Sequence, residues 1–126
     1  MAKVLLLQFD TDPQRANRRN ALSRLDAQIA EAEPRWPSFF DAVSAQRPDV
    51  IVIACGRLTA YAREAARYLG EGFNTRDIGL VLVGIPEKKR AAFEDYVRTY
   101  QPNATFVDDT RLADTVAARL VRAGTP

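Results

Sequence analysis

Three short runs of consecutive apolar residues constrain the fold of this chain more than any other feature. They are "KVLLLQF" at 3–9, "DVIVIA" at 49–54 and "IGLVLVGI" at 78–85. None alternates apolar with polar residues, so each predicts a strand that is buried on both faces, as in a parallel sheet covered by helices. Two weaker strand candidates complete the set: "ATFV" at 104–107, and "AQIAEA" at 27–32, whose partial alternation suits an edge strand.

Helical patterns separate these runs. Asp12 is expected to cap the first helix, and Gly70 is expected to end the third, whose buried stripe should include Leu58. Prolines precede several of the patterns, where they favour the first helical turn. The expected helices cover residues 13–25, 37–46, 58–70, 86–100 and 110–124.

The alternation of strand and helix repeats five times, at the interval typical of right-handed crossover units. We therefore predict an α/β fold: one doubly wound (βα)5 domain over residues 1–126, with five parallel strands in the flavodoxin-like order 2-1-3-4-5. The sequence contains no internal repeat and no linker long enough to divide it into two domains.

Composition excludes several classes of site. The chain has no histidine and one cysteine, so usual zinc sites, histidine-dependent nucleophilic catalysis and an internal disulfide are ruled out. The first apolar run is too short for a signal peptide or a membrane span, and we expect a cytoplasmic protein. Net charge is only +2, and the basic residues, 15 of 18 of them arginine, do not gather in one recognition helix, which disfavours DNA binding.

The carboxyl ends of parallel strands are where ligands and catalysis gather in folds of this kind. We therefore expect any functional site among the residues that follow the predicted strands. These residues are Asp10, Thr11 and Asp12 after the first strand, Ala54, Cys55 and Gly56 after the third, Gly84 at the fourth, and Asp108 and Asp109 after the fifth.

Two stretches resemble bacterial response-regulator receiver domains. They are "VLLLQFDTDPQRANRRNALSRL", an apolar strand that leads into acidic residues and an arginine-bearing helix, and "RPDVIVIA", which is similar to the strand that ends at the phosphorylated aspartate. The resemblance places the acidic pair of the family on Asp10 and Thr11, and the phosphoacceptor on Ala54. It places the hydroxyl residue at Gly84 and the lysine at Asp108. Only Asp10 keeps the family's residue type.

These departures imply a receiver-like domain that is not phosphorylated. An acyl phosphate needs a carboxylate oxygen, which Ala54 lacks, and a shift of the alignment by one residue would bring only Cys55 to the site. Mg²⁺ would lose oxygen ligands, and Asp108 would repel a phosphoryl group. The resemblance thus implies a pseudo-receiver, neither enzyme nor cofactor protein, that signals by binding other proteins.

Two alternatives stay open at the strand ends. Asp10 with Asp12 could hold a weakly bound Mg²⁺, although the plainer interpretation is that Asp12 caps the first helix and Asp10 is hydrogen-bonded in the turn before it. The second alternative is a flavodoxin-like small-ligand domain or small enzyme that uses Cys55 and Arg57, with Cys55 as a redox-sensitive thiol. A buried structural cysteine is the plainer interpretation of Cys55.

Partner binding is expected on the face formed by the fourth helix, fifth strand and fifth helix, because receivers commonly pair through it. A homodimer or a signalling protein could dock there. Separately, Arg15, Arg18 and Arg19 are spaced as neighbours on the first helix, and we expect them on a solvated helix face. The residues predicted for the partner face are Lys89, Arg90, Tyr100, Arg111 and Arg119.

Overall fold

A single parallel sheet of five strands forms the centre of the molecule. The computed structural model describes residues 1–56 and 58–123. The strands lie in the order β2-β1-β3-β4-β5, which confirms the predicted fold and the edge position of the second strand. The strands are β1 (Ala2–Leu7), β2 (Ala27–Ala32), β3 (Val50–Ala54), β4 (Gly79–Val83) and β5 (Thr105–Val107).

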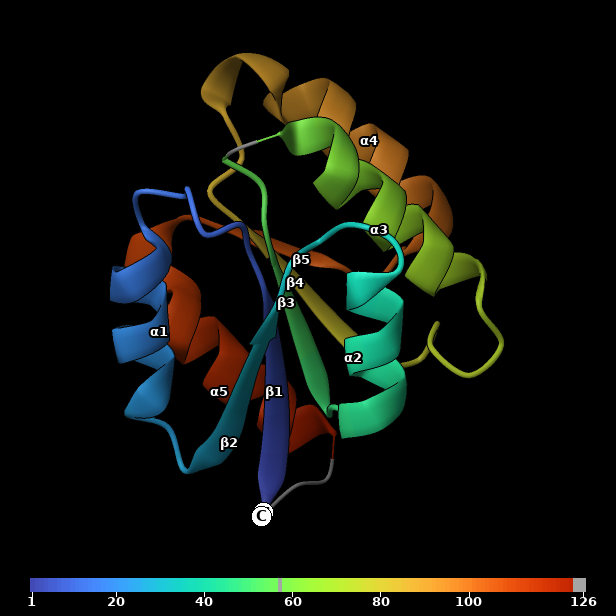
Figure 1. The fold of residues 1–126 in the computed structure, drawn as a ribbon. Helices are drawn as coiled ribbons and strands as arrows, with labels where there is room; N and C mark the ends of the chain where they lie inside the picture. Colours follow the sequence, from blue (N-terminus) through green and yellow to red (C-terminus); the bar gives the residue numbers. More distant parts are fainter. Residues whose placement is uncertain (57, 124–126) are drawn as a thin grey trace.

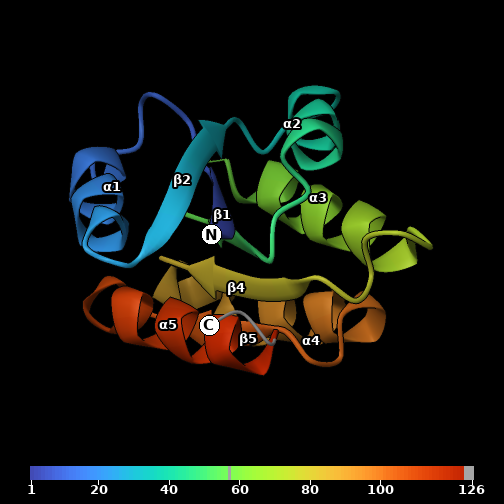
Figure 2. The ribbon, with the colours of Figure 1, turned by 90° about the horizontal axis from the view of Figure 1, so that it is seen from below.

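Helices cover both faces of the sheet, as Figures 1 and 2 show. Helices α1 and α5 lie on one face, and α2, α3 and α4 lie on the other. Short 3₁₀ turns, η1 (Glu87–Lys89) and η2 (Asp109–Arg111), precede the last two helices. The helices are α1 (Arg15–Ser23), α2 (Ser38–Gln46), α3 (Thr59–Glu71), α4 (Arg90–Tyr100) and α5 (Leu112–Arg122).

The strands feed two separate cores because successive side chains of a strand point to opposite faces. In β1, Leu5 and Leu7 pack in the core beneath α2, α3 and α4, whereas Val4 and Leu6 pack in the core beneath α1 and α5. Each of these side chains is at most 1% exposed. Full burial of one such side chain stabilises the fold by about 2 kcal/mol, which explains why the central strands β3 and β4 contain no polar side chain.

The first helix begins later than predicted. It starts at Arg15, two residues beyond Pro13, and the residue before it, Gln14, makes no capping hydrogen bond through its side chain. Asp12 does not cap the helix in the expected way. Its Oδ1 accepts a hydrogen bond from the backbone N–H of Gln14 at 2.9 Å, while its Oδ2 lies 2.8 Å from Nη1 of Arg18. One oxygen of the Asp12 carboxylate therefore stabilises the turn, and the other binds the buried guanidinium.

Two expectations for α3 are wrong. Leu58 is 54% exposed and precedes the helix, so it does not join the buried stripe. Gly70 does not end the helix, which continues to Glu71. The glycine instead allows a close approach of α4, because a Cβ atom at this position would lie 2.5 Å from the carbonyl oxygen of Tyr100.

No helix within residues 1–56 and 58–123 combines the length and the apolar character that crossing a membrane requires.

Candidate functional site

A buried arginine occupies the carboxyl end of the sheet. Arg18 is only 3% exposed, and its guanidinium contacts two carboxylates. Nη1 donates to Oδ2 of Asp12 at 2.8 Å, and Nε donates to Oδ1 of Asp109 at 2.7 Å. Nη2 donates to the other oxygen of Asp109 at 3.3 Å, and Nη1 lies 3.5 Å from Oε1 of Gln8. All three guanidinium nitrogens therefore already have acceptors within the protein.

The fold brings these groups together because α1 and α5 cover the same face of the sheet. Asp12 lies in the turn between β1 and α1, and Asp109 opens the 3₁₀ turn after β5. Gly84, which follows β4, completes the site by leaving space. Its φ is +75°, and a Cβ atom there would lie 2.6 Å from Nη2 of Arg18. A side chain at Gly84 would thus compete with the guanidinium for the same volume.

Electrostatics favour the charged form of this arginine. Burial alone disfavours the guanidinium charge, but hydrogen bonds and charge interactions with Asp109 and Asp12 outweigh it and raise the pKa of Arg18. Removal of one partner from a buried ion pair typically costs about 3–5 kcal/mol, since it leaves an uncompensated charge. The three side chains consequently act as one unit that a ligand could enter only by breaking these contacts.

Cys55 lies behind this unit as a structural residue. It is fully buried, its N–H donates to the carbonyl of Val83 at 2.9 Å, and its Sγ lies 3.4 Å from the carbonyl oxygen of Ile53. Burial raises the pKa of the Cys55 thiol strongly, and the nearby charge of Arg18 offsets this only in part. Reactive cysteines have depressed pKa values and access to solvent, so this environment does not suit the redox role considered for Cys55. The Arg57 candidate lies outside the residues that the structure describes.

Asp10 and Thr11 do not reach the site. β1 ends at Leu7, which pairs with Ile53 of β3, so Gln8 rather than Asp10 is level with Ala54. Phe9 is buried, and the chain then turns outward. The Asp10 side chain is 82% exposed and lies 3.8 Å from Arg15. The expectation that Asp10 belongs to the strand-end pocket is therefore wrong, because the strand stops earlier than its apolar run.

The side chains of the other two carried-over positions, Ala54 and Asp108, do not contact the guanidinium of Arg18 in any of its hydrogen bonds or ion pairs. Ala54 is 2% exposed, and its side chain packs in the core beneath α1 and α5. Asp108 is exposed, and its Oδ1 accepts a hydrogen bond from the hydroxyl of Thr110 at 2.7 Å. This bond is the main cause of the lowered pKa of Asp108.

The prediction that three arginines of α1 lie on a solvated helix face is wrong for Arg18 and correct for Arg15 and Arg19. Arg15 and Arg19 are roughly half exposed, and both lie within 3.6 Å of the carboxylate of Glu31. Arg18 points instead toward α5. One signal in the sequence could have indicated this: the first and last helices of this strand order share a face, which places Asp109 close to the start of α1.

Mg²⁺ does not fit this site as it is built. Asp12 and Asp109 supply carboxylate oxygens, but both already neutralise Arg18, and a divalent cation would have to displace a guanidinium held by hydrogen bonds. Within the described part of the chain, no group of three or more potential metal-binding side chains is positioned around one point. The Asp10 side chain is exposed and lies beside Arg15, outside the unit that Asp12 forms with Arg18.

The residues predicted for the partner face are dispersed. Lys89 lines a hollow of about 300 Å³ between α3 and α4, and Arg90 is ion-paired with Glu94 of its own helix at 2.7 Å. The Tyr100 ring packs against Tyr96 in a tilted arrangement, with ring centres 5.4 Å apart. Arg111 is exposed at the end of η2.

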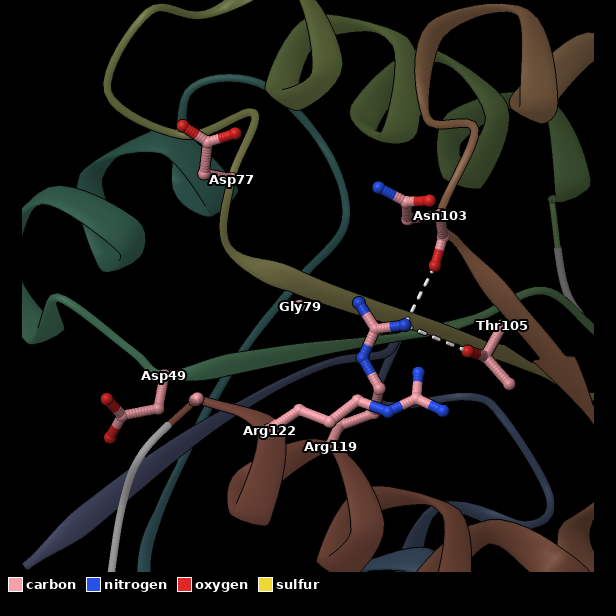
Figure 3. Close-up of a pocket in the computed structure, with 8 residues that line it drawn as sticks. Asp49, Asp77, Gly79, Asn103, Thr105, Arg119 and Arg122 are labelled. Carbon is pink, nitrogen blue, oxygen red and sulfur yellow. Dashed lines mark hydrogen bonds between the residues drawn. The ribbon is translucent and has the colours of Figure 1, made fainter.

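Arg119 lies at the opposite, amino end of the sheet. Figure 3 shows it in a hollow of about 340 Å³, where its Nη1 donates to the Asn103 carbonyl at 2.8 Å and to the Thr105 hydroxyl at 3.1 Å. Burial and the nearby charge of Arg122 lower the pKa of Arg119. The role of Arg119 here is to fasten the start of β5 to α5.

Solved structures share this architecture. The signal receiver domain of a modulated diguanylate cyclase from Desulfovibrio desulfuricans G20 matches with a TM-score of 0.72 and 18% identity, over 98% of this chain and 93% of that one. The signal receiver domain of a signal transduction histidine kinase from Syntrophus aciditrophicus matches with a TM-score of 0.70 and 23% identity, over 96% and 91% of the two chains. The chain has the receiver-domain fold.

A response regulator from Hahella chejuensis is similar at a TM-score of 0.64 and 14% identity, over 98% of this chain and 93% of that one. No protein-family model matches the sequence, and no curated protein matches it closely enough to count as a relative. The likeness therefore rests on the fold.

Proposed function

We propose that this chain is a receiver-like signalling module that is not switched by aspartyl phosphorylation and that acts by binding other proteins. The observation that carries the proposal is the Arg18 guanidinium, held between Asp12 and Asp109 at the carboxyl ends of the strands. It occupies the place where folds of this type receive ligands. The similarity to signal receiver domains supplies the signalling context.

Chemistry at the strand ends supports the absence of phosphorylation. β3 ends at Ala54 and is followed by Cys55, and neither residue supplies the carboxylate oxygen that an acyl phosphate requires. A phosphoryl group would also approach two aspartates that share one arginine, so the three side chains together already carry one excess negative charge. Such a group would add to this negative charge, and within the described residues the guanidinium of Arg18 is already engaged by both carboxylates.

The runner-up function, a small-ligand domain or enzyme with its site at the strand ends, is less well supported. Arg18 fills the space beside Gly84, and Cys55 is fully buried with a raised thiol pKa. A nucleotide or flavin would need this space. A thermal-shift titration with these ligands would favour the runner-up if one of them stabilised the protein and Arg18→Ala changed its affinity.

Incubation with acetyl phosphate and Mg²⁺, followed by intact-mass measurement, tests the proposal. We expect no mass increase that corresponds to a phosphoryl group. A phosphodonor-reactive receiver domain run in parallel shows that the reagent is active. Stoichiometric, hydroxylamine-sensitive phosphorylation of this chain would contradict the proposal, because hydroxylamine cleaves acyl phosphates.

A further inference from the structure

A hollow of about 460 Å³ lies between α3 and the segment that joins β2 to α2, on the face opposite α1 and α5. Its walls are aromatic: Trp36, Phe39, Tyr61 and Tyr68 all line it. Trp36 is 52% exposed, and Tyr61 and Tyr68 are each 44% exposed, so their rings remain open to solvent. The volume lies within the range of small-molecule sites, roughly 300–1,000 Å³. We name this hollow the aromatic pocket.

The pocket has a packed end and an open end. The Tyr68 ring centre is 4.7 Å from that of Trp36 and 5.8 Å from that of Phe39, so these rings hold one another in place. Tyr61 lies seven residues before Tyr68, which corresponds to about 10 Å along the helix. Ala65 lies between them on the same helix face and carries only a methyl group. Its small side chain leaves the gap between the two tyrosines unfilled.

Charges near the pocket favour a cation. Glu64 is the charged residue among those that line it. Arg67 lies 3.1 Å from Glu64 and 3.6 Å from Glu71, and Arg35 lies 3.4 Å from Glu33. The guanidinium of Arg63, which precedes Glu64 in the chain, lies over the Tyr96 ring at 4.9 Å, so these surrounding charges balance. The negative charge that lines the pocket itself is that of Glu64.

A cation is already held by aromatic rings at the edge of the pocket. The guanidinium carbon of Arg35 is 5.9 Å from the Tyr61 ring centre and 5.4 Å from the Phe9 ring centre. The faces of aromatic rings carry negative partial charge, and they attract cations within about 6 Å. The exposed rings of Trp36 and Tyr68 offer the same interaction to an incoming ligand.

We propose that the aromatic pocket binds an organic ammonium ion whose charge is shielded by methyl groups, such as a trimethylammonium group. Methyl groups contact ring faces while the positive charge is attracted by the rings and by Glu64. A metal cation does not suit these walls, because it requires oxygen ligands. This inference does not depend on the proposed signalling function, since none of its residues contacts Arg18.

Trp36 reports binding directly, because it is the only tryptophan of the chain. We would titrate the protein with choline and with its neutral isostere 3,3-dimethyl-1-butanol, and follow the fluorescence of Trp36. The proposal predicts saturable binding of choline that is at least tenfold tighter than that of the alcohol. Affinity for choline no greater than for the alcohol would overturn it, unless the trimethyllysine peptide of the parallel titration below binds saturably.

Variants locate the ligand within the pocket. Tyr68→Leu should weaken choline binding at least tenfold, and Glu64→Gln should weaken it severalfold, with both folds checked by circular dichroism. Tyr100→Leu, a tyrosine outside the pocket, is the matched control and should bind choline as the parent does. If Tyr100→Leu and Tyr68→Leu were to lose binding equally, the proposed site would be wrong.

A parallel titration with a short peptide that contains trimethyllysine distinguishes the source of the ammonium group. Tighter binding of the peptide than of choline indicates a peptide-borne group, and tighter binding of choline indicates a free metabolite. Either result supports the proposed ligand chemistry. Failure of both ligands to bind contradicts it.

Discussion

Nε of Arg18 lies 2.7 Å from Oδ1 of Asp109, although the two residues are 91 positions apart in the chain. This contact joins the first helix to the turn that precedes the last one, across the carboxyl ends of the strands. With Asp12 on its other side, the guanidinium fills the place where this fold receives ligands. The domain thus fills this site with a guanidinium that two of its own carboxylates hold in place.

Loss of this arginine should destabilise the fold strongly. Arg18→Met would leave Asp12 buried without its cation, and we expect the free energy of unfolding to fall by about 3 kcal/mol or more. The measurement is equilibrium unfolding in urea at neutral pH. Arg19→Met is the matched control: Arg19 is 42% exposed and pairs with Glu31 at 3.4 Å, so its loss should cost at most about 1 kcal/mol. Equal losses in both variants would show that Arg18 is not held as described.

Gly84→Ala should destabilise the domain, whereas Gly56→Ala should not do so to the same extent. At Gly84 a Cβ atom would have an unfavourable positive φ and would displace Nη2 of Arg18, and left-handed backbone alone costs a non-glycine residue roughly 1–2 kcal/mol. At Gly56 the nearest atom is 3.5 Å from the added carbon, an ordinary contact. Thermal unfolding of the two variants compares them. A Gly84→Ala protein as stable as the parent would contradict the close packing of the guanidinium.

Gly70→Ala should be destabilising, against the usual trend for helices. Alanine in a helix interior is normally favoured over glycine by about 0.5–1 kcal/mol. Here the added carbon would lie 2.5 Å from the Tyr100 carbonyl oxygen and would push α4 away from α3. Urea unfolding measures the sign of the change. A stabilised variant would refute the close approach of these helices.

Cys55 should make stability depend on pH in the alkaline range. Burial raises its thiol pKa in the folded state, whereas the unfolded chain releases this proton at the ordinary thiol pKa of about 8.5. Above that pH the folded state binds more protons than the unfolded state, so the contribution of Cys55 is complete below it and decreases as pH rises. The parent should therefore lose more stability than Cys55→Ala between about pH 8 and pH 10. Parallel curves would exclude this thiol as the cause.

The sheet could be predicted from the sequence because its strands are buried on both faces. A continuous apolar run as short as Val50–Ala54 suits a buried strand and is too short for a buried helix. The right-handed crossovers between parallel strands then allow only a small set of strand orders. The exact end of β1 could not be predicted, because Gln8 and Phe9 continue its buried pattern after the ladder stops. That shift of a few residues moved Asp10 out of the expected site.

The site was harder to predict because its central contact is long-range. Arg18 has the same local pattern as Arg15 and Arg19, and local spacing cannot distinguish a buried arginine from a solvated one. Its burial depends on Asp109, which only the tertiary structure brings near. The aromatic pocket was missed for the same reason, since Trp36 and Tyr68 come from separate elements.

The NMR signal of the Nε–H group of Arg18 tests the central claim most directly. Its proton is hydrogen-bonded to Asp109 and buried, so it should exchange slowly with water, more slowly than that of Arg19. Addition of Mg²⁺ with beryllofluoride, a phosphoryl mimic, should leave the signal in place. A saturable shift or loss of the Arg18 signal on this addition would contradict the account. It would mean that a phosphoryl group can bind at the strand ends and displace the guanidinium.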